Sequence, residues 1–138
     1  MKLLLPIDAS PHTADAVDYL KRLRPALAGT PQVLCLHVTY DLPATDELTV
    51  AEQARKVLRE DDLDFGPERI VADLNQAGFQ ASLQVAEGDA VEQIVRYGDQ
   101  ADLIVMGSHG RGTLAQAVTG SVSTKVLAEG RTPVLLVK

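Results

Sequence analysis

The chain has 138 residues, of which 46% are hydrophobic and 23% are charged, and these values predict one globular domain spanning residues 1–138. The net charge of −6 and the 4% aromatic content, with no Trp, argue against nucleic acid or an anionic membrane as the main partner. The single cysteine, Cys35, cannot form an internal disulfide, and residues 1–5 are too short for a signal-peptide core or a membrane span. We therefore expect a cytoplasmic protein.

Five short apolar runs predict the strands of a sheet. They are nearly continuous in hydrophobic residues, which is typical of strands covered on both faces. The predicted strands are Lys2–Ile7, Val33–Val38, Phe79–Val85, Leu103–Met106 and Val134–Val137. Helical segments separate them, and this alternation predicts a parallel α/β sheet with right-handed crossovers.

The helices have recognisable start and stop signals. Ser10 and Pro11 have the types expected at a helix N-cap and first position, and Pro25 ends or bends the helix that follows. Further helices are predicted in Asp46–Ala77 (interrupted at residues 65–67), after the Asp89-x-x-Glu92 capping box, and in Ser121–Glu129 before Gly130. Asp41–Gly66 is acidic, and we interpret it as a solvated helix rather than a mobile flap.

Residues 106–123, MGSHGRGTLAQAVTGSVS, are rich in glycine and hydroxyl side chains and follow the fourth predicted strand. No glycine here is followed by lysine, which excludes a Walker loop. Gly110-x-Gly112-x-x-Ala115 fits a dinucleotide fingerprint, but it lacks the later ribose-binding acid and follows the wrong strand, so we attribute that match to chance. Residues 107–138 carry four basic and one acidic residue, which makes this part of the chain suitable for an anion.

A third spacing, Gly107-x-x-Gly110, nine residues and then Gly120-Ser121, is complete. Here the sequence resembles the universal stress proteins, whose nucleotide-binding members carry G-x-x-G-x(9)-G-[ST] after the fourth strand. The run from Leu5 to Ser10, in which Asp8 ends the first strand, and the final Pro133–Val137 are also similar to that family. The resemblance covers essentially the whole chain.

The resemblance implies an open five-stranded sheet of order 3-2-1-4-5, Rossmann-like and related to the adenine nucleotide alpha hydrolases, with helices on both faces. It implies ATP, ADP or AMP in the crevice between the first and fourth strands. Because few cations lie near this part of the sequence, we expect Mg²⁺ or Mn²⁺ to accompany the phosphates. The resemblance also implies a homodimer through Val134–Val137. The implied nucleotide-binding residues are Pro6, Ile7, Asp8, Ala9, Val38, Met106, Gly107, Ser108, His109, Gly110, Gly120, Ser121, Val122 and Ser123.

The chemistry of these residue types agrees with an anion site. Gly107 and Gly110 permit close backbone approach and positive φ, and residues 121–123 offer the unpaired N–H groups of a helix start. The hydroxyls of Ser121 and Ser123 can also donate to phosphate oxygens. The alternatives are that the glycines only form turns, that Ser121 only caps the helix, and that Val38 and Met106 only pack in the core.

Other side chains give weaker patterns. His12, His37 and Cys35 do not match a zinc-binding spacing, no G-x-S-x-G elbow supports a hydrolase triad, and Lys125 and Arg131 are candidates to neutralise phosphate. We predict no catalytic residue and no metal ligand, with at most slow ATP hydrolysis or autophosphorylation. The favoured function is a stress-response nucleotide-binding or signalling module; the alternatives are a dimeric scaffold without nucleotide and, third, a transferase.

Overall fold

A computed structural model describes residues 1–8, 10–39, 66–108 and 121–138. Five parallel strands form one sheet in the order β3-β2-β1-β4-β5, which confirms the predicted fold class and strand order. The strands are β1 (Lys2–Ile7), β2 (Gln32–Thr39), β3 (Gln80–Glu87), β4 (Leu103–Gly107) and β5 (Val134–Val137).

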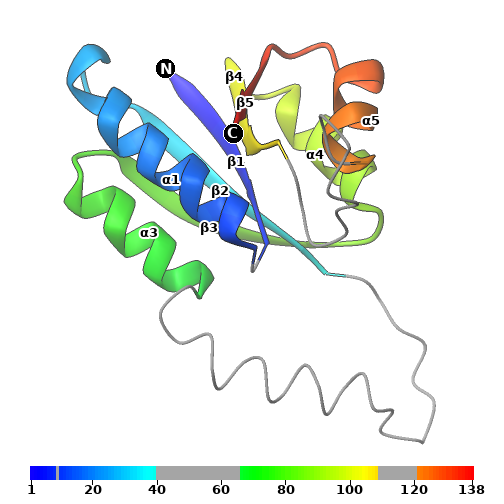
Figure 1. Ribbon diagram of the computed structural model, residues 1–138, viewed down its shortest axis with the longest axis horizontal. Coiled ribbons are helices and arrows are strands. Elements are labelled where there is room, and N and C mark those ends of the chain that lie inside the picture. Colours follow the sequence, from blue (N-terminus) through cyan, green and yellow to red (C-terminus); the bar gives the residue numbers. More distant parts are fainter. Residues whose placement is uncertain (9, 40–65, 109–120) are drawn as a thin grey trace, which may run out of the picture.

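Helices cover both faces of this sheet (Figure 1). On one face, α1 (Pro11–Leu23) and α3 (Pro67–Gln76) bury a cluster that includes Leu3 and Leu5 of β1. On the other face, α4 (Ala90–Gly98) and α5 (Ser121–Glu129) pack over a cluster that includes Leu4. Successive side chains of a strand point to opposite faces, so a central strand must be apolar at every position.

The edge strand β3 differs from that expectation. Its side chains are exposed or partly buried, none is fully buried, and Val85 is 50% exposed. The prediction that this strand is covered on both faces is therefore wrong. The physical reason is its place in the strand order: at the edge of the sheet the helices cover β3 only in part, with Ala81 and Leu83 packed on the α1 face and Ala86 on the other.

The predicted helix boundaries are largely confirmed. Helix α1 starts at Pro11 with Ser10 as its N-cap, and it ends where a 3-10 turn, η1 (Arg24–Ala26), contains Pro25. The Asp89 carboxylate accepts a hydrogen bond from the Glu92 N–H at 2.9 Å, as the capping box predicts. Most of Asp41–Gly66 lies outside the described residues, and within the described parts of the chain no helix is long and apolar enough to cross a membrane.

Candidate functional site

The hydrogen-bonded pairing of β1 and β4 stops short of the carboxyl ends of these strands. The two strands pair only through Leu3 with Leu103 and Leu4 with Ile104. Beyond that point β1 remains paired with β2 as far as Ile7, while β4 remains paired with β5 as far as Gly107. This is also where the strand order reverses, the position at which open parallel sheets bind ligands.

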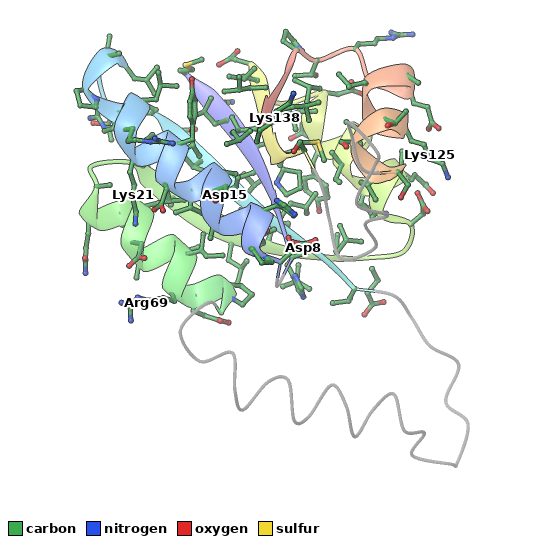
Figure 2. The ribbon with its side chains drawn as sticks, in the orientation of Figure 1. Asp8, Asp15, Lys21, Arg69, Lys125 and Lys138 are labelled. Carbon is green, nitrogen blue, oxygen red and sulfur yellow. The ribbon has the colours of Figure 1, made fainter. Side chains whose placement is uncertain are left out.

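Asp8 stands directly after β1, next to the beginning of α1 (Figure 2). Its Oδ1 accepts hydrogen bonds from the Ser10 N–H at 3.1 Å, the Ser10 hydroxyl at 2.5 Å and the Thr13 hydroxyl at 2.7 Å. The Asp8 N–H in turn donates to Thr13 Oγ1 at 3.1 Å. Ser10 and Thr13 are buried, at 7% and 4% exposed, so the carboxylate is held by donors that cannot turn away into water.

Gly107 ends β4, and its role differs from the predicted one. A Cβ placed there would lie 2.6 Å from the Cβ of His12 and 2.8 Å from the His12 carbonyl oxygen, so the first turn of α1 already occupies the space. Gly107 also has no positive φ, because it is a strand residue paired with Val137. The expectation of positive φ is therefore wrong here, and the glycine is needed for helix packing.

Ser108 and Ser123 connect β4 to the first turn of α5. The Ser108 N–H donates to the Val137 carbonyl at 2.8 Å, and the Ser123 hydroxyl donates to the Ser108 carbonyl at 3.3 Å. Both serines are buried, at 1% and 2% exposed. The Ser123 hydroxyl thereby holds the helix start against the strand end, and its contact with phosphate stays a prediction. Ser121 is exposed and is the first residue of that helix.

The remaining predicted residues divide into core and undescribed positions. Met106 is buried against α4 and α5, and Val38 packs partly buried against the same cluster, which agrees with the core-packing alternative. Ile7 is buried on the α1 face, and Pro6 is partly buried. Four predicted residues lie outside the described residues: Ala9, His109, Gly110 and Gly120.

Sequence reasoning missed two contributors, His12 and Thr13. The contact of His12 with Gly107 joins positions far apart in the sequence and has no local signal. The link between Asp8 and Ser10 does have one, because an aspartate often bonds the N–H two residues later in a turn. On the α1 face of the sheet, the buried Cys35 thiol lies in apolar surroundings that raise its pKa to about 12, so it is an inert core group rather than a nucleophile.

The sequence model of the Universal stress protein family matches residues 1–138. The chain belongs to this family. Over 73 residues it is 36% identical to the universal stress protein MJ0577 of Methanocaldococcus jannaschii, a match covering 51% of this chain and 45% of that protein. Another match, to the stress response protein NhaX of Bacillus subtilis, covers 46% of that protein at 35% identity, so the matches span under half of these curated relatives.

Solved universal stress proteins share this fold. The structure of MJ0577 has a TM-score of 0.77 and 28% identity, over 99% of this chain and 94% of that one. A universal stress protein in complex with cAMP has a TM-score of 0.64 at 22% identity, over 99% and 94%. One from Archaeoglobus fulgidus in complex with dAMP has a TM-score of 0.60 at 16% identity, over 100% and 98%. At such identities the last two show the fold alone.

Proposed function

We propose that this universal stress protein binds ATP or another adenine nucleotide in the opening between β1 and β4, and acts as a cytoplasmic binding or signalling module in stress responses. The observation that carries the proposal is the end of the pairing between these strands at Leu4 and Ile104, with the organised carboxylate of Asp8 at the end of β1 and the start of α5 held against the end of β4. Two proteins of the same fold, solved with cAMP and dAMP, support a nucleotide as the ligand class.

In this proposal the nucleotide lies across the opening, with its phosphates at the start of α5. Residues 121–123 form the first turn of that helix, whose dipole favours an anion. Gly110 and Gly120 supply the close backbone approach, and Mg²⁺ or Mn²⁺ comes with the phosphates. The adenosine lies along residues 6–9. Because we assign no general base, ATP hydrolysis is at most slow.

Titration calorimetry with ATP and Mg²⁺ tests this proposal. We expect saturable heat from the wild type and none from Gly120→Val, whose side chain would occupy the phosphate position. Gly66→Val is the matched control, because Gly66 also precedes a helix, has an ordinary extended backbone, and has only the Glu68 carboxylate at 3.6 Å from an added Cβ. If Gly120→Val binds ATP like the wild type, the phosphate placement is wrong; no heat from the wild type contradicts nucleotide binding altogether.

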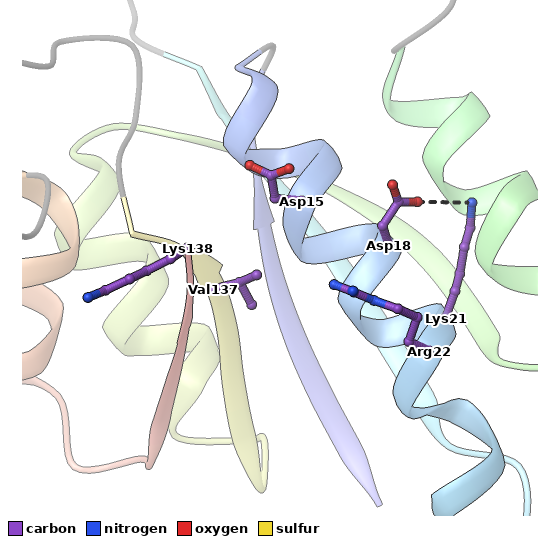
Figure 3. Close-up of a pocket in the computed structure, with 6 residues that line it drawn as sticks. All are labelled: Asp15, Asp18, Lys21, Arg22, Val137 and Lys138. Carbon is purple, nitrogen blue, oxygen red and sulfur yellow. Dashed lines mark ion pairs between the residues drawn. The ribbon is translucent and has the colours of Figure 1, made fainter. Parts of the chain in front are cut away.

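We further propose that the protein is a homodimer through β5, which has a neighbour on one side only. The carbonyls of Pro133 and Val137 accept hydrogen bonds from the N–H groups of Ile104 and Ser108, so the alternate residues of β5, Val134 and Leu136, direct their N–H and C=O groups to the open edge. Such a row is a template for pairing with another strand. A surface hollow of about 450 Å³ lies at the end of this strand, between Lys138 and charged residues of α1 (Figure 3).

Analytical ultracentrifugation tests the dimer. Leu136→Pro removes an N–H that β4 does not use, so we expect a folded monomer from this variant and a dimer from the wild type. A wild-type monomer at micromolar concentration contradicts the proposal. A dimer that gives no heat with ATP supports the second candidate function, a dimeric interaction protein, over the first.

A further inference from the structure

The hydrogen bonds around Asp8 form a closed set. The Thr13 hydroxyl donates to Asp8 Oδ1 and accepts from the Asp8 N–H. The side chain of Thr13 therefore holds both the carboxylate and the backbone of Asp8. Ser10 adds two donors, its N–H and its hydroxyl, to the same carboxylate oxygen. All the donors converge on Oδ1, which fixes the rotation of the carboxylate.

This arrangement differs from ordinary capping of α1. Ser10 occupies the N-cap position, where the hydroxyl normally accepts a hydrogen bond from an N–H of the first turn, but it makes no such side-chain cap. The Thr13 N–H instead bonds the Ser10 carbonyl at 3.1 Å. Both buried hydroxyls are therefore directed at the carboxylate, although one of them could have capped the helix.

The second carboxylate oxygen remains available. Among the described residues Oδ2 of Asp8 has no hydrogen-bond partner, and no described buried side-chain oxygen lacks one, so Oδ2 is accessible to solvent. An ionised carboxylate oxygen is an acceptor only, and its hydrogen bonds are about twice as strong as neutral ones. The group that it suits is a hydrogen-bond donor of the ligand.

We propose that Thr13 and Ser10 are positioning residues, which hold Asp8 so that Oδ2 accepts a hydrogen bond from the nucleoside of the bound nucleotide. This rests on the proposed nucleotide binding and adds to it the residues that orient the acceptor. A nucleoside has two kinds of suitable donor, the exocyclic amine of adenine and the ribose hydroxyls. Neither Thr13 nor Ser10 needs to touch the ligand.

Calorimetry on Thr13→Val, Thr13→Ser and Thr132→Val tests this role. Valine keeps the shape of threonine but removes the hydroxyl, and we expect affinity for ATP to fall by roughly tenfold, the usual effect of one lost charged hydrogen bond. Thr13→Ser keeps the hydroxyl and should bind within about threefold of the wild type. Thr132→Val is the matched control: Thr132 lies in the loop between α5 and β5, and the variant loses a hydroxyl bond of 2.8 Å to the carbonyl of Gly98 at the end of α4.

Two analogues of ATP identify the donor: ITP lacks the exocyclic amine, and dideoxy-ATP lacks the ribose hydroxyls. The wild type should prefer ATP to one of these two, and Thr13→Val should lose that preference, which a merely structural role would leave unchanged. Wild-type affinity in a folded Thr13→Val variant overturns the proposal. The proposal is also overturned if Thr13→Val loses affinity equally for ATP, ITP and dideoxy-ATP. If the wild type binds none of them, the proposed function itself fails, and this inference fails with it.

Discussion

Two short strand-to-helix junctions of this protein each contain an aspartate, and they use it differently. At the β3–α4 junction, Asp89 is the N-cap and accepts one hydrogen bond, from the Glu92 N–H at 2.9 Å. At the β1–α1 junction, Asp8 stands two residues before the N-cap and accepts from both Ser10 and Thr13. Only the second junction lies where β1 and β4 separate.

The comparison distinguishes an aspartate that only caps a helix, Asp89, from one whose carboxylate is oriented by neighbouring side chains, Asp8. A single side-chain bond to the first turn is sufficient to begin α4. The hydroxyls at the start of α1 orient a carboxylate instead, at the end of the sheet where parallel α/β proteins bind their ligands. Comparing the two aspartates therefore distinguishes what helix initiation requires from what a site requires, and the variants below test that distinction.

Gly107→Val should have the largest effect, because it acts on the β1–α1 junction from the opposite strand. The added Cβ would lie 2.6 Å from the Cβ of His12, so α1 must move away from β4. We expect the free energy of unfolding to fall by about 3 kcal/mol, a typical cost of overpacking, in urea denaturation. Gly66→Val, where space is available, should change it little. If the urea midpoint of Gly107→Val equals that of the wild type, the contact between Gly107 and His12 is not rigid.

Asp8→Ala should come next, because it removes the acceptor of three donors and leaves two buried hydroxyls to find new partners. We expect a loss of about 2 kcal/mol in the free energy of unfolding. The same variant should lose affinity for ATP in calorimetry. A destabilised protein with full affinity would assign Asp8 to the fold alone.

Asp89→Ala should have a smaller effect, about 1 kcal/mol of unfolding free energy, the usual value of an N-cap. Its affinity for ATP should equal that of the wild type, because α4 begins after β3 at the edge of the sheet. A loss of affinity similar to that of Asp8→Ala would remove the distinction between the two junctions.

Cys35 belongs to neither junction, and the ionisation of its thiol should not affect stability at neutral pH. Burial raises the pKa of its thiol from 9.0 to about 12, so the folded protein retains a proton that the unfolded chain releases. Its contribution to stability is complete below pH 9 and is lost as the pH rises towards 12. The melting temperatures of the wild type and Cys35→Ala should be measured across this pH range, and that of the wild type should fall more steeply as the pH rises. If the two melting temperatures fall in parallel, the raised pKa of Cys35 is contradicted.

The sequence by itself determined the features that depend on neighbouring residues. Apolar runs located the strands, Ser10 and Pro11 located the start of α1, and Asp89 with Glu92 located the start of α4, because periodicity and capping are local properties. The hydrogen bond from Ser10 to Asp8 is also local and could have been predicted from their spacing.

Tertiary structure decided the features that depend on strand order and close approach. The exposure of Val85 follows from the edge position of β3, which an apolar run cannot indicate. Gly107 is a glycine because His12, almost a hundred positions earlier, lies against it, and the Ser123 hydroxyl bonds the Ser108 carbonyl for a similar reason. A sequence motif can place residues at the ends of strands, but which groups face a ligand and which face one another is set by how the helices pack on the sheet.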